Sequence, residues 1–233
     1  MSFIILPPLK RFVRKQPLIY GVLNTLYASL RRLQDKDIFC TKAKVTNKGY
    51  GRFRKLIRGS NNQIIIGQDT CLRSTLFHII GHNNRIIIGD SCTIGQDCSF
   101  WMEGNNITIT IGSGTTFTQL CHFNAQENDA RIDVGEDCMF SNKIIVRTSD
   151  SHPIYDMSSG KRINSPKPVI IGKHVWIAPD SKIMKGAIIG DGCIIGSNTM
   201  VSKQIPENSL AVGMPAKVVK EGIKWTREDI IFK

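Results

Sequence analysis

Large apolar residues return at every sixth position along much of the chain, and an Ile-Gly or Val-Gly step opens many of these six-residue units. The steps begin at Ile66, Ile88, Ile111, Val134, Ile171, Ile189 and Ile195. The longest unbroken apolar series is Ile171, Ile177, Ile183, Ile189, Ile195 and Val201. A period of six suits a solenoid with three flat faces, whose coils stack about 4.8 Å apart. We therefore predict a mainly β protein, a left-handed parallel β-helix of about six coils.

The position four residues after each inward apolar residue is small, as a tight corner requires. It is occupied by Thr70, Cys92, Cys98, Thr115, Cys121, Cys138, Ser181, Ala187, Cys193 and Thr199. Five of the seven cysteines are thereby assigned to the core of the solenoid. An odd number of cysteines at such positions argues against a disulfide framework.

Interruptions of the repeat predict where loops leave the solenoid. Short surpluses rich in Asn and Gly, at 81–84, 104–106 and 127–129, are expected to form compact corner loops. A far longer surplus covers residues 147–168, with three prolines and Gly160. Long loops on rigid scaffolds are where function tends to lie. The predicted β-helix therefore covers residues 59–212 and carries a candidate catalytic loop at 147–168.

Both ends of the chain depart from the repeat. Residues 1–58 are expected to form a basic, partly helical segment, because apolar residues between 16 and 34 recur at three- and four-residue spacing. This helix either packs on the solenoid or lies on a membrane surface. Residues 213–233 are expected to cap the last coil with a short helix near 226–232, since an open solenoid edge invites aggregation.

The net charge of +12 lies in the first quarter of the chain. Up to Arg58, 14 basic residues face only Asp35 and Asp37, whereas 17 basic and 17 acidic residues follow. This asymmetry indicates either an anionic partner, such as a membrane surface, an acidic glycan or nucleic acid, or simply a solvated basic cap. Nucleic acid is disfavoured, because no recognised motif or aromatic platform accompanies the charge.

The sequence shows no convincing signal peptide and no apolar stretch of the roughly 20 residues that span a bilayer. We expect a cytoplasmic protein, with peripheral contact at the inner face of the bacterial cytoplasmic membrane through residues 1–34 as one option.

Two residues carry candidate chemistry. His152, next to Pro153 in the long loop, is a candidate general base, because the pKa of a histidine lies near neutral pH. Trp176 ends the six-residue unit that starts at Ile171, so the phase of the repeat turns its ring outward. An outward tryptophan predicts a ligand or subunit contact.

Four motifs, together with the solenoid, resemble the hexapeptide-repeat acetyltransferases. They are Ser149-Asp-Ser-His-Pro-Ile154, Val175-Trp-Ile-Ala178, Val201-Ser-Lys-Gln-Ile-Pro206 and Gly213-Met-Pro-Ala-Lys217. The chain resembles the galactoside and maltose acetyltransferases and, more closely, the polysialic-acid and capsule O-acetyltransferases, over residues 60–220. The first 58 residues do not match the enzymes of small sugars. The resemblance implies a homotrimer that transfers acetyl from acetyl-CoA to a hydroxyl of a bacterial surface glycan of capsule, polysialic-acid or lipopolysaccharide type.

The resemblance also implies a role for each matched position. His152 corresponds to the catalytic base, and Trp176 to the residue beside the thioester and pantetheine arm. Ala178 and Ser197 would offer backbone groups to the pantetheine amides, and Lys203 and Lys217 would face the nucleotide phosphates. The candidate substrate-binding residues are Asn124, Asp150 and Tyr155. Either Asp150 or Asp156 could orient the imidazole, and their spacing does not choose between them.

Other activities compete with this interpretation. An N-acetyltransferase acting on an amino-sugar nucleotide would use much the same residues, and a trimeric scaffold would need no chemistry. A zinc hydratase would require three converging histidines from among His78, His82, His122, His152 and His174. His78 and His82 lie four residues apart, which suits a helix rather than this solenoid. We therefore expect no metal.

Overall fold

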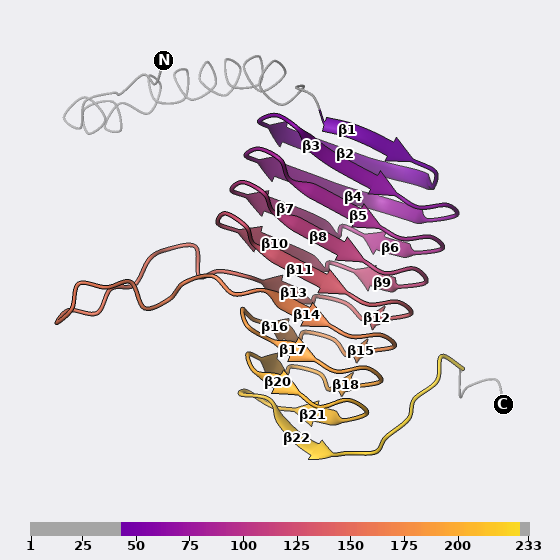
Figure 1. Ribbon diagram of the computed structural model, residues 1–233. Coiled ribbons are helices and arrows are strands. Elements are labelled where there is room, and N and C mark those ends of the chain that lie inside the picture. Colours follow the sequence, from indigo (N-terminus) through magenta and orange to yellow (C-terminus); the bar gives the residue numbers. More distant parts are fainter. Residues whose placement is uncertain (1–42, 229–233) are drawn as a thin grey trace, which may run out of the picture. The chain divides into compact units, whose positions relative to one another are not determined.

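The structure is a computed structural model that describes residues 43–228, and every regular element in that range is a β-strand. The strands stack coil upon coil along one axis (Figure 1). Neighbouring strands pair in parallel, except that β22 runs antiparallel to β21. The predicted parallel β-helix is confirmed. The helix expected within residues 16–34 lies outside the described residues.

The coils present three faces, numbered here in chain order within a coil. The first face is the eight-stranded sheet of β1 (Ala43–Asn47), β3 (Asn62–Ile66), β5 (Arg85–Ile88), β8 (Thr108–Ile111), β11 (Arg131–Val134), β14 (Val169–Ile171), β17 (Ile188–Ile189) and β20 (Gln204–Ile205). The second face is the row of β6 (Thr93–Gln96), β9 (Thr116–Gln119), β12 (Met139–Phe140), β15 (Trp176–Ile177), β18 (Ile194–Ile195) and β21 (Leu210–Val212), extended by β22 (Lys217–Lys220). The third face is the row of β7 (Ser99–Glu103), β10 (His122–Gln126), β13 (Ile145–Arg147), β16 (Lys182–Ile183) and β19 (Met200–Val201). The long strands β2 (Tyr50–Arg58) and β4 (Cys71–Ile80) run across the second and third faces.

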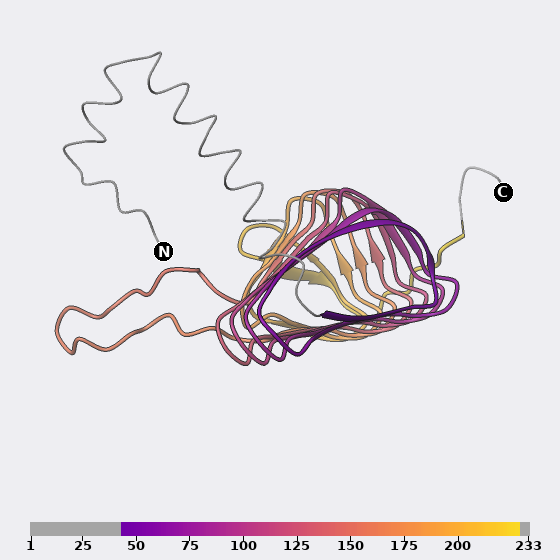
Figure 2. The same cartoon turned by 90° about the horizontal axis from the view of Figure 1, so that it is seen from above.

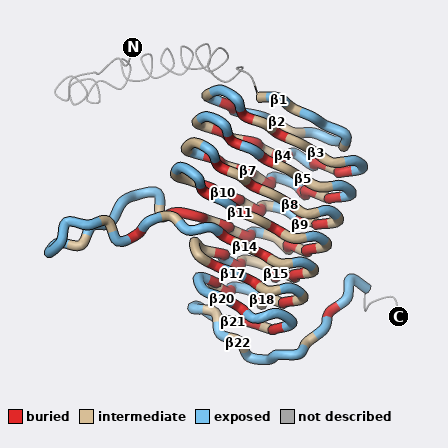
Figure 3. The backbone as a smooth tube through the Cα atoms, viewed as in Figure 1, coloured by how far each residue is buried: buried red, intermediate tan, exposed pale blue. Residues whose placement is uncertain are grey.

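The interior holds the residues that the repeat directs inward (Figure 3). Phenylalanines on successive coils stack, with ring centroids 5.5 Å apart for Phe77 and Phe100 and 5.3 Å apart for Phe100 and Phe123. Ring pairs of this kind add to the free energy of burial itself. The five cysteines assigned to the core, from Cys92 to Cys193, are all buried and free. The position of a residue within its six-residue unit therefore predicts which side chains form the core.

The predicted corner loops adopt the left-handed backbone that Asn, Asp and Gly tolerate. Asn83 and Asn106 both have φ of 58°, and Asp129 has φ of 61°. The N–H of each donates to a carbonyl one coil earlier, that of Ser60, His82 and Asn105 respectively. The surplus residues thus continue the coil-to-coil hydrogen bonding that the strands begin.

The predicted start of the solenoid at residue 59 is wrong. Strand β1 pairs in register with β3, from Ala43 opposite Asn62, and β2 pairs with β4. The basic residues of β2 point to solvent while Ile57 is buried against the core. Charge dominates this segment, which has no Ile-Gly step, and Phe53 and Ile57 are the two side chains of β2 that are not exposed.

The predicted helical cap is not found in the part of the tail that the structure describes. The chain forms β22 and then continues without a helix to Glu228, and residues 229–233 lie outside the described range. Strand β22 completes hydrogen bonds with β21, so a strand and an extended tail follow the last coil. No helix within residues 43–228 is long and apolar enough to cross a membrane.

Candidate active site

The long loop leaves the solenoid at the corner between the third and first faces, between the end of β13 and the start of β14 (Figures 1 and 2). Its two arms form a hairpin. The N–H of Ile163 donates to the carbonyl of Ile154, at 2.9 Å, and Tyr155 pairs with Arg162 across the arms. The hairpin therefore projects away from the solenoid as an ordered arm.

The buried side chain of Asn164 holds the backbone around His152. Its Nδ2 donates to the carbonyl oxygen of His152 at 2.8 Å, and its Oδ1 accepts from the N–H of Ile154 at 2.7 Å. Asn164 is 7% exposed, whereas the His152 side chain faces solvent. The loop thus fixes the main chain at His152 and leaves the imidazole accessible to a substrate.

Asp150 lies near Asn164, where the loop joins the solenoid. Its Oδ2 accepts from Lys185 Nζ at 2.5 Å and from Asn164 Nδ2 at 2.9 Å. These hydrogen bonds, that from Lys185 first, lower the pKa of the Asp150 carboxyl below its ordinary value. Asp150 is therefore a carboxylate that binds Lys185 and fixes the loop.

The hydrogen bonds of Asn164 to the backbone around His152 form one clamp on the loop. A second clamp, between Arg162 and Glu127, joins the returning arm of the hairpin to the solenoid. Arg162 donates two hydrogen bonds to the Glu127 carboxylate, at 2.6 and 2.8 Å, and Ser149 Oγ donates to the same group at 2.5 Å. The bond from Arg162 is the largest cause that lowers the pKa of Glu127. Paired hydrogen bonds of a guanidinium to a carboxylate add geometric precision to their energy.

The carboxyl groups of Asp150 and Asp156 have hydrogen-bond partners other than the imidazole. Asp156 lies at the tip of the hairpin, where hydrogen bonds from Ser158 and Ser159 lower its pKa to about 2. Within residues 43–228, the His152 ring makes no hydrogen bond with either carboxylate. A group that orients the ring therefore has to come from elsewhere than these two side chains.

Asn124 lies at the root of the loop, on the outward side of the third face. It pairs in register with Trp101 on one side and Arg147 on the other, and its carbonyl accepts from Thr148 N at 3.1 Å. The Arg147 guanidinium reaches into the loop and donates to Ser151 Oγ at 2.7 Å. The structure thus brings Asn124 and Asp150 to the loop root, whereas Tyr155 is 59% exposed on the arm.

Trp176 opens the second face, and the C-terminal tail packs beside it. The ring centroids of Trp176 and Trp225 are 6.1 Å apart. Trp225 stacks on His174 and is 6% exposed. The tail is fixed further by Arg227, which donates to the Asp137 carboxylate and to the carbonyl of Cys138 at 2.8 Å. The outward ring of Trp176 thus has a neighbour from its own chain that the repeat did not predict.

The four other candidate donor-binding residues divide between two places. Ala178 and Ser197 follow β15 and β18 at the corner between the second and third faces, and Lys217 opens β22. The N–H of Ala178 donates to the Ile195 carbonyl at 2.8 Å, so its carbonyl oxygen is what remains for a ligand. Lys203 lies between β19 and β20, at the corner from which the loop leaves. Trp176, Ala178, Ser197 and Lys217 therefore share one side, and Lys203 lies on the side of His152.

His152 and Trp176 lie on opposite sides of one solenoid. The loop and the C-terminal tail leave the solenoid on different sides (Figure 2). Trp176 begins β15 on the second face, and the tail packs beside it where the first face meets the second. The heights of His152 and Trp176 along the axis nearly match, because β12 and β13 share a coil and β12 pairs directly with β15. One chain therefore presents the two residues at similar levels, separated by the width of a face.

The remaining histidines each have a local partner. His82 and His122 hydrogen-bond Ser60 and Ser99 at 2.8 Å, His174 contacts Asp137 and Trp225, and His78 packs on Trp101. Among residues 43–228, no group of three or more His, Cys, Asp or Glu side chains is arranged to hold a metal.

Comparison with known proteins shows which proteins the chain is similar to. Residues 168–203 match the bacterial transferase hexapeptide model. The chain is 35% identical over 178 residues to a polysialic acid O-acetyltransferase of Neisseria meningitidis, covering 73% of this chain and 78% of that protein. It is 41% identical over 93 residues to a polysialic acid O-acetyltransferase of Escherichia coli, covering 40% of this chain and 30% of the relative's length.

A solved structure agrees with these sequence relatives. The crystal structure of the polySia-specific acetyltransferase NeuO superposes with a TM-score of 0.70 at 30% identity, over 81% of this chain and 90% of that one. This likeness covers much more of the chain than the residues that match the family model. On this evidence the chain belongs to the hexapeptide-repeat acetyltransferases.

Proposed function

We propose that the protein transfers an acetyl group from acetyl-CoA to a hydroxyl of a bacterial surface glycan, of the capsule, polysialic-acid or lipopolysaccharide type. The observation that carries the proposal is the clamp of Asn164 on the backbone of His152, which presents an accessible imidazole on an ordered loop. The two sequence relatives supply the substrate class, since both are polysialic acid O-acetyltransferases.

His152 has the chemistry of the base in such a transfer. Its imidazole would accept the proton of the sugar hydroxyl while the hydroxyl oxygen attacks the thioester carbonyl. The same proton would then pass to the sulfur of CoA as the carbon–sulfur bond breaks. Proton and acetyl group are both accounted for in this direct transfer, so neither a serine nor a cysteine nucleophile is required.

Acetyl-CoA would lie along the side that carries Trp176. The indole offers an outward aromatic surface, and the carbonyl of Ala178, the backbone of Ser197 and the ammonium group of Lys217 follow on the same side. The indole N–H of Trp176 is buried and has no hydrogen-bond partner among the described residues. A buried unpaired donor costs about 1–3 kcal/mol, which favours a partner or ligand at this position.

The position of the two residues favours a site shared between copies of the chain. Rotation about an axis parallel to the solenoid keeps heights unchanged, so the loop of one copy would meet the Trp176 face of the next at the same level. The arm also exposes apolar side chains: Ile154 by 51%, Tyr155 by 59%, Met157 by 102% and Ile163 by 65%. Such residues on a projecting arm are typical of a subunit contact. We therefore propose a homotrimer, in which Lys203 would accompany His152.

A turnover screen tests the activity. Acetyl-CoA is supplied with acidic polysaccharides and amino-sugar nucleotides, and products are identified by mass spectrometry before and after mild alkali, which removes O-acetyl esters but not amides. We expect an alkali-labile product that His152→Ala reduces about 10²–10⁴-fold with acetyl-CoA binding retained. More than about a tenth of the parent activity in that variant would contradict the role of the base. An alkali-stable product would indicate N-acetylation, and acetyl-CoA binding without any product would favour a scaffold.

Mixed oligomers test the shared site. His152→Ala and Trp176→Ala chains carry different tags, are co-expressed, and trimers that contain both are purified. Each mixed trimer would regain about one intact site in three, because one interface pairs an intact His152 with an intact Trp176. Each variant by itself should stay nearly inactive. Mixed trimers without recovered activity would show that each chain builds its own site.

A further inference from the structure

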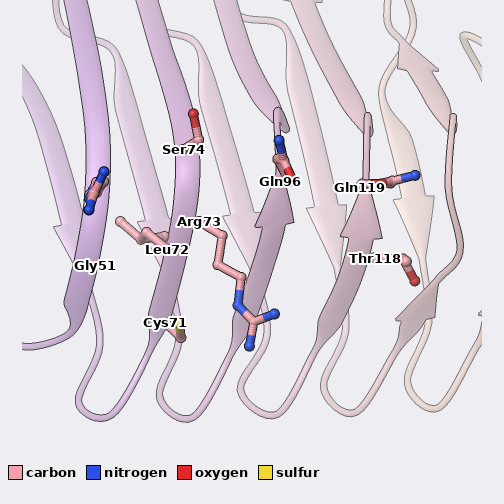
Figure 4. Close-up of a pocket in the computed structure, with 9 residues that line it drawn as sticks. Gly51, Cys71, Leu72, Arg73, Ser74, Gln96, Thr118 and Gln119 are labelled. Carbon is pink, nitrogen blue, oxygen red and sulfur yellow. The ribbon is translucent and has the colours of Figure 1, made fainter.

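A hollow of about 490 Å³ lies at the corner between the second and third faces, near the N-terminal end of the solenoid (Figure 4). It is lined by Gly51, Arg52, Cys71, Leu72, Arg73, Ser74, Gln96, Thr118 and Gln119. Its volume falls in the range of small-ligand sites. None of the residues discussed above for acetyl transfer lines it.

The hollow exists because the corner shortens toward the N-terminal end. Between Ile94 on the second face and Phe100 on the third face, the chain advances by six residues. In β4, Leu72 pairs with Ile94 and Phe77 pairs with Phe100, so the same corner is turned in five residues. In β2 the matched stretch from Gly51 to Lys55 takes four. Because the corners of β2 and β4 are shorter, the backbone there lies further in than at Gln96 and Gln119 of the following coils (Figure 4). Ser74 makes the shorter turn with a left-handed φ of 61°.

Six of the nine lining residues carry polar side chains, and two of these six are arginines. Arg52, Arg73, Gln96 and Gln119 are exposed, and among the described residues none of these four side chains forms a hydrogen bond. A guanidinium presents a planar fork of donors that fits a carboxylate, and the carboxamides offer donors and acceptors that fit sugar hydroxyls. Tyr50, 63% exposed and register-paired with Cys71, adds an aromatic surface beside the hollow.

The segment that begins the solenoid carries a net positive charge. Between residues 43 and 80 the chain carries seven basic residues and one acid, Asp69. The basic residues are Lys44, Lys48, Arg52, Arg54, Lys55, Arg58 and Arg73. No lining residue is acidic. A concave surface with one sign of charge concentrates ligands of the opposite sign.

We infer that this hollow binds a carboxylate-bearing sugar unit of an acidic glycan, as a contact separate from the site of acetyl transfer. The inference rests on the proposed function for its link to the acceptor. The hollow and the loop root lie at opposite edges of the third face, which the five residues of β10 span in about 16 Å. One sugar unit cannot reach both places, so the hollow would hold a long chain several units away from the reacting one.

Direct binding to the full-length protein tests the inference apart from catalysis. The probes are polysialic acid, hyaluronan and polygalacturonate, with dextran as the neutral control and anionic phosphatidylglycerol vesicles as the membrane control. We expect the parent and His152→Ala proteins to bind at least one carboxylate polymer and not dextran. The double variant Arg52→Ala/Arg73→Ala should weaken that binding at least tenfold.

Two further variants distinguish specific binding at the hollow from general attraction of the polymer to a positively charged protein. Lys44→Ala/Arg85→Ala removes the same charge from exposed positions of the first face and should change binding less than twofold. Gln96→Ala/Gln119→Ala removes no charge and should still weaken polymer binding several-fold. Equal weakening by the two charge variants, an unchanged affinity in the glutamine variant, or no parent binding to any carboxylate polymer would overturn the inference. So would vesicle binding that depends on Arg52 and Arg73 while polymer binding does not.

Turnover then distinguishes this inference from the proposed function. On long acceptors the arginine variant should raise KM at least tenfold with kcat unchanged, whereas acceptors of one or two units should show no change. Polymer binding at the hollow without acetyl transfer to any glycan would leave the inference standing and reject the activity. Acetyl transfer with polymer binding that is indifferent to all hollow variants would do the reverse.

Discussion

Trp225 lies flat against His174, with ring centroids 3.9 Å apart and ring planes at 10°. Two hydrogen bonds lock the pair, from Trp225 Nε1 to the His174 carbonyl at 2.9 Å and between His174 Nε2 and the Trp225 carbonyl at 3.1 Å. His174 also hydrogen-bonds Asp137 through Nδ1 at 2.6 Å. The tail is therefore attached through a histidine that directly precedes the coil of Trp176.

Trp225→Ala should release the tail and leave one side of Trp176 uncovered. We expect the KM for acetyl-CoA to rise about tenfold, the equivalent of 1.4 kcal/mol, with the free energy of unfolding lowered by the loss of a buried aromatic side chain. Acrylamide quenching of Trp176 fluorescence should be greater in Trp225→Ala than in Trp225→Phe, both in a Trp101→Phe background that leaves Trp176 as the one tryptophan of the sequence. Trp225→Phe keeps an aromatic ring at this position and should leave the KM for acetyl-CoA close to that of the parent protein. Unchanged quenching and KM in the alanine variant would show that the tail does not position Trp176.

Asn164→Ala should impair transfer through the position of His152 rather than its chemistry. Loss of both hydrogen bonds frees the backbone at His152, and a displacement of about 1 Å near reacting groups can cost about 10²-fold in rate. We expect kcat to fall 10–100-fold with the KM for acetyl-CoA unchanged, measured in steady-state assays. Ser165→Ala, at the exposed neighbouring position, is the matched control and should keep full activity. A variant of Asn164 with normal kcat would remove the clamp from the mechanism.

The loop base should loosen in acid. Glu127 and Asp150 have pKa values below their ordinary 4.5 and 3.8, so both carboxylates contribute stability that is complete above those values. That contribution is lost as the pH falls through the lowered pKa values, which places the change below pH 4.5 for Glu127 and below pH 3.8 for Asp150. A spin label on Met157→Cys, with Cys40 and Cys71 replaced by serine, should report a more mobile arm in that range.

Glu127→Gln supplies the control for acid loosening. Its arm should already be more mobile at neutral pH, because the amide cannot attract Arg162 as a carboxylate does, and it should change less on acidification. A label whose mobility is the same from pH 7 to pH 3 in the parent would contradict the role of the two carboxylates.

The repeat identified the core and the loop but not what holds the loop. Burial of Phe100 or Cys138 follows from position in a six-residue unit, which is a local property of the sequence. The ion pair of Arg162 with Glu127 joins residues 35 apart, and their approach depends on the path of the whole loop. The turn-forming residues at 127–129 predict a corner loop. Nothing in the sequence predicts that the Glu127 carboxylate at this corner binds the long loop.

The two ends of the solenoid show a related limit. The strand β2 is mostly exposed and tolerates basic residues between Phe53 and Ile57, so composition indicated a separate segment although the backbone continues the stack. Trp225 lies in a tail without periodicity, and its place beside His174 arises from a contact 51 residues away. Nothing in the spacing of the tail predicts that contact.

Asn84 offers a test of how the corners stabilise the fold. It is fully buried, its Nδ2 donates to the Gly104 carbonyl at 2.9 Å, and its Oδ1 accepts from Ile107 N at 2.9 Å. Asn84→Ala leaves the Gly104 carbonyl and the Ile107 N–H without these hydrogen bonds, and each loss costs about 1–3 kcal/mol of stability. We expect chemical denaturation to show a free energy of unfolding lower by at least 2 kcal/mol. Asn128→Ala removes an exposed amide that also bonds the preceding coil, and should cost within about 1 kcal/mol because water replaces the lost bonds. Equal losses in the two variants would mean that burial of the corner amide does not set its contribution.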